Sequence, residues 1–120
     1  LAPTHQSCVA QNTDTLPTVM AAVGLDLPAG IDGKALQNGC RSWAGSAQFE
    51  VGSVSFTAVD DGNYKLTYSC QNHVTTVESK DGSALPDAVG AALYRHLRDY
   101  TADTLAAVPG AHCEMPDTLD

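Results

Sequence analysis

The sequence predicts a single α+β domain spanning residues 1–120, in which an antiparallel sheet carries two helices on one face. Residues 48–77 alternate apolar and polar side chains on both sides of an acidic, glycine-containing turn, which is typical of a hairpin. Two Leu-Pro dipeptides, at 16–17 and 85–86, each open a run of small and apolar residues suited to a helix. Helices and strands segregated along the chain in this way form α+β folds.

The two helices are expected at residues 17–24 and 86–103. The first is short and ends at a glycine, a common residue just past a helix C-terminus. The second carries one apolar stripe at i, i+4, i+7, i+8 and i+11, which consists of Val89, Leu93, His96, Leu97 and Tyr100. Each helix has one apolar side, so both are predicted to cover the same face of the sheet.

The central hairpin is predicted to turn through three residues, 60–62, with Gly62 in the left-handed conformation. A two-residue loop of Asp61 and Gly62 would put the two apolar faces on opposite sides of the sheet. The three-residue loop places Phe56 opposite Leu66, and all the apolar side chains then face one way. A one-sided sheet of this kind needs helices to cover it.

The segments beside the hairpin are expected to lengthen the sheet. The phase of the apolar residues flips across residues 52–53, which predicts a bulge within one strand at 49–58. The second strand is expected to run on to about residue 77, and a final strand is predicted near 107–115. An unpaired edge strand can add to a second copy, so we expect a monomer or a weak dimer.

The charge balance limits the classes of partner. Six basic residues oppose fourteen acidic ones, for a net charge of −8. Such a chain repels phosphate backbones and anionic membrane surfaces, so nucleic acid is not an expected partner. No apolar run approaches the length of a transmembrane segment, and none is predicted.

Four cysteines, at 8, 40, 70 and 113, are widely spaced and form no C-x-x-C motif. Two disulfides in an oxidising compartment explain this pattern, and four buried free thiols in a cytosolic core are the alternative. The chain begins without Met, as a mature protein does after signal-peptide removal, so a secreted, extracellular location is expected. Of the three pairings, we favour Cys8–Cys113, which would join the chain ends, with Cys40–Cys70, which would hold the long loop against the sheet.

Motifs for catalysis, cofactors or metals are not found in the sequence. His73, His96 and His112 form no H-x-x-x-H pattern, and "DDGN" at 60–63 lacks the glutamate that a calcium loop needs twelve residues in, where Gln71 stands. Neither a G-x-S-x-G elbow nor a phosphate-binding glycine loop occurs. We therefore assign no catalytic, cofactor-binding or metal-binding residue.

Aromatic residues supply the candidate binding surface. Trp43, the only tryptophan, follows Cys40 by three residues and fits either a plug in the core or an anchor for a partner. Tyr64 and Tyr68 lie on the apolar face of the hairpin. We predict that an exposed patch or pocket between sheet and helices would involve Trp43, Tyr64 and Tyr68.

The stretch from Cys40 to Cys113 also carries a family resemblance. A cysteine and a Trp-containing strand lead to a hairpin ending "YKLTYSC", then "QNHV", the helix "LPDAVGAALYRHLRDY" and a last cysteine. This order is similar to the Ecp2-type (Hce2) putative necrosis-inducing domain of small secreted fungal proteins, and more distantly to fungal killer-toxin-like α/β proteins. The resemblance covers about three fifths of the chain and implies no active-site residue.

The resemblance implies a fungal virulence factor: a secreted effector or toxin that acts on host or competitor cells by binding rather than catalysis. Its partner would be a protein or another component of the target cell surface. The first alternative is a binding module for small molecules or of the protease-inhibitor type, with a pocket between sheet and helices. The second is a compact secreted hydrolase, which predicts a histidine and a carboxylate converging in one cleft.

Overall fold

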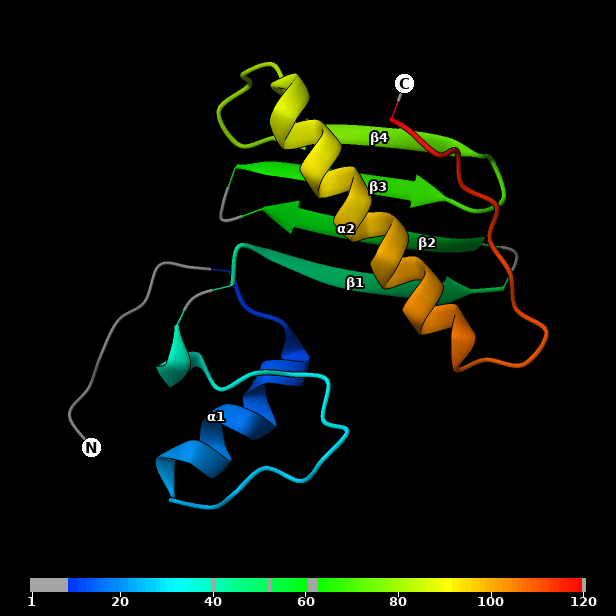
Figure 1. Cartoon of the computed structure of the whole chain (residues 1–120). Helices are drawn as coiled ribbons and strands as arrows, with labels where there is room; N and C mark the ends of the chain where they lie inside the picture. Colours follow the sequence, from blue (N-terminus) through cyan, green and yellow to red (C-terminus); the bar gives the residue numbers. More distant parts are fainter. Residues whose placement is uncertain (1–8, 40, 52, 61–62, 120) are drawn as a thin grey trace.

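A computed structural model of the chain describes residues 9–39, 41–51, 53–60 and 63–119. Its centre is an antiparallel sheet with strand order β1-β2-β3-β4, formed by Trp43–Glu50 (β1), Ser53–Asp60 (β2), Tyr64–Ser69 (β3) and Val74–Ser79 (β4). The long helix α2, Asp87–Ala106, crosses one face of this sheet diagonally (Figure 1). The α+β class predicted from the sequence is confirmed.

Alternating side chains give the sheet one apolar and one polar face. Phe56 of β2 and Leu66 and Tyr68 of β3 are almost fully buried in the core that the sheet forms with α2. On the opposite face the hydroxyl groups of Thr57 and Thr67, cross-strand partners in β2 and β3, hydrogen-bond at 3.0 Å. The one-sided sheet expected from the hairpin pattern is therefore present.

The predicted apolar stripe forms the buried side of α2. Leu93 and Leu97 are 2% and 0% exposed and join the core of the sheet. The hydroxyl of the buried Thr101 donates to the Leu97 carbonyl oxygen at 2.8 Å, which satisfies a polar group that burial would otherwise penalise. The helices in the described part of the chain lack the length and hydropathy of a bilayer-spanning segment.

The register between β2 and β3 differs from the prediction by two residues. Phe56 lies opposite Tyr68 rather than Leu66. A shift of two residues leaves every side chain on its original face, so burial of the apolar face does not distinguish the two registers. The predicted left-handed Gly62 lies outside the described residues.

Two segments predicted as single strands are hairpins. β1 and β2 are antiparallel neighbours with Glu50 opposite Ser53, so the phase flip marks a chain reversal and the predicted bulge is wrong. Similarly, β3 ends at Ser69 and β4 begins opposite it at Val74, so the strand does not run straight on to residue 77. In the turn between them, His73 has the left-handed φ of 56°.

We use the name N-terminal unit for residues 9–39, which contain the 3-10 turns η1 (Asn12–Asp14) and η2 (Leu36–Asn38) and the helix α1 (Thr15–Ala22). The unit lies beyond the β1 edge of the sheet, and the main contacts of α1 are with η1 and η2 (Figure 1). The prediction that both helices cover one face is therefore wrong for the first helix. Its apolar side chains and those of the following loop stay exposed: Leu16, Val19, Val23, Leu25, Leu27 and Ile31.

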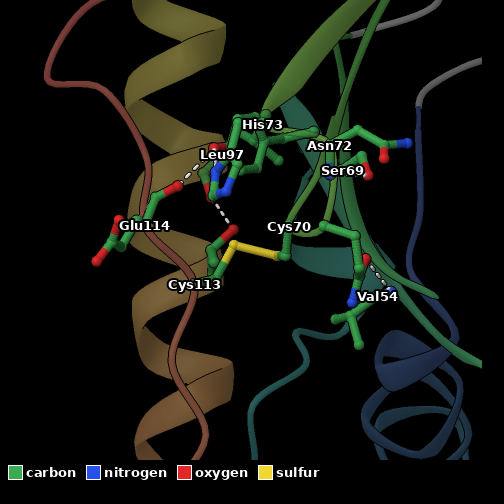
Figure 2. Close-up of a disulfide and its surroundings, with 11 residues drawn as sticks. Val54, Ser69, Cys70, Asn72, His73, Leu97, Cys113 and Glu114 are labelled. Atoms are coloured by element: carbon green, nitrogen blue, oxygen red, sulfur yellow. Dashed lines mark hydrogen bonds between the residues drawn. A yellow bond between two sulfur atoms is a disulfide. The ribbon is translucent and has the colours of Figure 1, made fainter. Parts of the chain in front are cut away.

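A disulfide between Cys70 and Cys113 joins the end of β3 to the C-terminal segment (Figure 2). The predicted pairs Cys8–Cys113 and Cys40–Cys70 are both wrong, because the C-terminal segment passes directly over the end of β3. Cys8 and Cys40 themselves lie outside the described residues. No strand forms in the described residues 107–119, which run beside α2 and end near β4, so the predicted final strand is wrong as well (Figure 1).

Candidate functional site

A groove of about 820 Å³ lies where the N-terminal unit, β1 and the C-terminal half of α2 meet. Trp43 from β1 and Tyr100 from α2 provide its aromatic lining. Polar side chains complete it from the N-terminal unit (Gln11, Asn12, Thr13, Asp32), from Arg41 just before β1, from β1 (Ser46), from the polar face of β2 (Thr57) and from α2 (Asp103, Thr104). Apolar surface combined with a few convergent polar groups is typical of ligand sites, and the volume falls in their usual range.

Trp43 is held in place by two side chains of α2. Its ring stacks on His96, with centroids 4.7 Å apart and planes 10° from parallel, and meets Tyr100 edge to face at 6.1 Å. His96 and Tyr100 lie four residues apart, so they project from the same side of the helix. Burial lowers the pKa of His96, with a smaller contribution from the charge of Arg95, so the stacked imidazole is neutral at pH 7. Trp43 is half-buried: it is partly in the core and partly on the groove wall.

Gly45 allows Tyr100 to approach the backbone of β1. A Cβ atom at Gly45 would lie 2.8 Å from the Tyr100 ring, closer than any unstrained contact. The same ring meets Phe56 edge to face at 6.4 Å, which connects the groove wall to the core. The Gly45 N–H donates to the Gln11 side-chain oxygen at 2.7 Å, which ties the N-terminal unit to the strand.

Asp14 anchors the N-terminal unit. Its carboxylate is 1% exposed and accepts two hydrogen bonds from the Arg41 guanidinium, both 2.6 Å long. It also accepts from the backbone N–H groups of Gln11 and Lys34, each at 2.9 Å. The bonds from Arg41 are the largest cause that holds the pKa of Asp14 well below its usual range, against the opposing effect of burial. Arg41 is therefore already neutralised where it borders the groove.

A second close approach shapes the same unit. A Cβ atom at Gly33 would clash with the backbone carbonyl group of Thr13, so only glycine lets the loop pass against η1. Neighbouring Asp32 is an exposed residue on the groove wall. The packing at Gly33 thus fixes the backbone that carries the Asp32 carboxylate.

The three predicted surface aromatics do not come together. Trp43 lines the groove, whereas Tyr68 is 1% exposed and lies in the core. Tyr64 is half-buried and its hydroxyl bonds to Ser83 at 2.8 Å, which ties β3 to the loop before α2. Of the predicted set, Trp43 alone borders the groove.

Tyr68 instead stabilises the region of the disulfide. Its hydroxyl donates to the carbonyl oxygen of Glu114, and His73 Nδ1 lies 3.2 Å from the same oxygen of Tyr68. Because the hydroxyl proton goes to the carbonyl, the Nδ1 atom of His73 is the donor to Tyr68. Burial, and to a smaller extent the charge of Glu114, raises the pKa of Tyr68. This bond and the neighbouring disulfide hold the C-terminal segment against β3.

The chemistry of the other candidates is limited. Within the described ranges, no three His, Cys, Asp or Glu side chains are close enough to hold a metal ion. In the same part of the chain, neither His73 nor His96 is hydrogen-bonded to a carboxylate; their partners are Tyr68 and the Trp43 ring. A second hollow, of about 550 Å³, lies between α2 and the C-terminal segment, where Arg98 pairs with Asp117 at 3.2 Å.

Sequence reasoning missed the anchor and half of the groove. Asp14 and Arg41 are 27 residues apart and belong to no motif, although Asp14 stands just before the predicted helix, where a capping residue is expected. Asp32 lies in the long loop after the first helix and Asp103 near the end of the second, and neither belongs to a sequence motif. Only the structure shows that both residues line one groove with Trp43.

Protein-family models, curated proteins and solved structures contain no match to this chain. The resemblance to the Ecp2-type domain therefore stays a prediction, and any function must be argued from the groove itself.

Proposed function

We propose that this chain is an extracellular binding protein of the effector or toxin-like class, which acts on another cell by contact through the groove around Trp43. The observation that carries the proposal is the placement of Trp43, a half-buried ring braced by His96 and Tyr100 at the wall of a groove. A rigid aromatic side chain loses little conformational entropy on binding, which is why Trp dominates many contact sites.

The covalent structure supports the proposed compartment. The Cys70–Cys113 disulfide is of the kind that persists outside the cytosol. With these two joined, Cys8 and Cys40 are the cysteines left for the second predicted disulfide. Their chain neighbours Val9 and Arg41 form an antiparallel bridge, and Cys8 and Cys40 themselves lie outside the described residues. Mass spectrometry of a non-reduced digest tests whether a second disulfide forms, and a free thiol at Cys8 or Cys40 would contradict that prediction.

A small-molecule binding module is the second candidate, and the size of the groove favours it. A volume of about 820 Å³ leaves room for a small molecule as well as for a protruding side chain of a partner. The two candidates share one site and differ in the ligand. A contact with a cell surface produces a cellular response, whereas a carrier of small molecules produces none.

The test is a cell-death assay in which the purified, disulfide-intact protein is applied to plant leaf and to fungal cells. Trp43→Leu removes the groove aromatic. Phe49→Leu is the matched control, because Phe49 lies on the same strand, is 55% exposed and is outside the groove. We expect death with the wild type and Phe49→Leu, and a loss of at least tenfold in potency with Trp43→Leu.

Two results would count against the proposal. Equal potency of the Trp43→Leu and Phe49→Leu proteins would remove the groove from the contact. No death of any cell by the intact wild type would contradict the effector or toxin class and favour the small-molecule module. Matching circular-dichroism spectra and melting temperatures of the variants establish that the comparison is between folded proteins.

A further inference from the structure

We propose that the groove binds an organic cation, an amine or a guanidinium group, between Trp43 and the carboxylates of Asp32 and Asp103. This inference rests on the proposed function, because it names the chemical class recognised at the same site. A basic side chain on the surface of a partner protein would supply the ligand.

The charge of the groove is the first reason to expect a cation. Arg41 is the single basic residue among the described residues that line it, and Asp14 neutralises Arg41 through two hydrogen bonds of 2.6 Å. Asp32 and Asp103 are exposed, and neither forms a salt bridge or side-chain hydrogen bond within the described part of the chain. The groove therefore has two uncompensated negative charges at its wall.

The aromatic lining of the groove is the second reason to expect a cation. Trp and Tyr rings attract cations to their faces through the ring quadrupole, and Trp does so most strongly. Trp43 and Tyr100 line the groove at 79° to each other, so their ring planes point in two directions. The stacked His96 is neutral at pH 7 and adds no repelling charge.

The whole chain favours the same ligand. Its net charge of −8 attracts cations from a distance and raises their rate of association. A neutral polyhydroxylated ligand, such as an oligosaccharide, would also find hydroxyl and amide groups in the groove. It would leave both carboxylates without a counter-charge, and for that reason the cation fits better.

The experiment uses a matched pair of probes. N-acetyl-arginine amide carries a guanidinium group, and N-acetyl-citrulline amide has nearly the same shape without the charge. Isothermal titration calorimetry measures both, and the fluorescence of Trp43, the only tryptophan, reports binding at the site. We expect the arginine probe to bind at least tenfold more tightly than the citrulline probe, and more weakly as salt concentration rises.

Charge-neutral variants localise the effect. Asp32→Asn and Asp103→Asn are each expected to weaken the arginine probe about fivefold, as removal of a partly exposed ion pair does. Asp26→Asn is the matched control: it changes the net charge equally, and Asp26 is exposed on the same loop as Asp32 but outside the groove. It should change the affinity by less than twofold. All three residues are exposed, so unchanged melting temperatures are expected and would show that the variants fold.

Several outcomes would overturn the inference. These are equal affinity for the two probes, an equal loss with Asp26→Asn, no binding of the arginine probe, or binding of a neutral trisaccharide in its place. The cell-death assay tests the proposed function separately from the recognition of a cation. If Trp43→Leu abolishes cell death while Asp32→Asn and Asp103→Asn keep full potency, the contact function stands and recognition of a cation is refuted.

Discussion

The N-terminal unit is held mainly by polar contacts, and replacing Asp14 tests this directly. Large apolar side chains in residues 16–31 remain exposed, whereas the Asp14 carboxylate is 1% exposed and accepts four hydrogen bonds. Asp14→Asn keeps the shape of the side chain but leaves the half-buried Arg41 charge without its counter-ion. Breaking a buried ion pair in this way costs about 3 kcal/mol or more.

The loss should be local. Because few apolar side chains bind the unit to the sheet, it can open while β1–β4 and α2 stay folded. Hydrogen exchange followed by mass spectrometry is the assay. A loss of about 3 kcal/mol corresponds to a roughly 150-fold drop in protection, expected in residues 15–39 and not in residues 64–100. Asp117→Asn is the control, because the Arg98–Asp117 pair is exposed and should contribute about 1 kcal/mol or less.

The pH dependence gives an independent readout. The folded-state pKa of Asp14 lies below its unfolded value of 3.8, so its stabilisation is complete above that pH and is lost as the pH falls towards the folded pKa. The wild-type unit should loosen on acidification below about pH 4, and the Asp14→Asn unit should lack that component. A change of less than threefold in the protection of residues 15–39, or an equal loss throughout the sheet, would refute the anchoring role.

Three further predictions concern the scaffold and the groove wall. Replacing Cys70 and Cys113 together by alanine opens a covalent loop with a sequence separation of 43 and should destabilise the protein by about 4 kcal/mol. Calorimetry should then show a fall of roughly 15 °C in Tm, and a fall of under about 4 °C would contradict the prediction. Gly45→Ala places a methyl group 2.8 Å from the Tyr100 ring and should lower the free energy of unfolding by about 1–3 kcal/mol in urea titrations, and an unchanged midpoint would show that the ring moves freely. The fluorescence of Trp43 should titrate with His96 at a midpoint below 6.5, because burial lowers the pKa of that imidazole, and the transition should vanish in His96→Gln; a midpoint above 6.5 would contradict the stacked, buried geometry.

Local patterns predicted the parts of the fold that depend on side-chain periodicity. The stripe that includes Leu93 and Leu97 placed α2, and alternation placed Phe56 and Leu66 on the covered face of the sheet. The predicted buried face stays correct even when the predicted register is wrong by two residues, because a strand shifted by two residues buries the same set of side chains. Periodicity alone could not distinguish a bulge from a reversal at residues 52–53, because either restores the phase.

The predictions that were wrong or missing concern contacts between residues that are distant in the sequence. The pairing of Cys70 with Cys113 follows from the path of a C-terminal segment that forms no strand in its described residues, and a hydrogen bond from Tyr68 helps to hold that path. The Asp14–Arg41 anchor joins residues whose neighbours in the sequence give no sign of it. The groove has the same origin, since Trp43 was a candidate while its acidic partners come from a loop and a helix far along the chain.

The disulfide also determines how the chain responds to mechanical force. Cys70 and Cys113 close a covalent loop that contains β4 and α2. Tension applied at the two ends of the protein passes through the sulfur–sulfur bond and bypasses residues 71–112. The oxidised chain therefore cannot release roughly 150 Å of its extended length, however far it unfolds. An unfoldase that pulls one polypeptide strand through a narrow pore would have to reduce this bond or accommodate two strands of the chain at once.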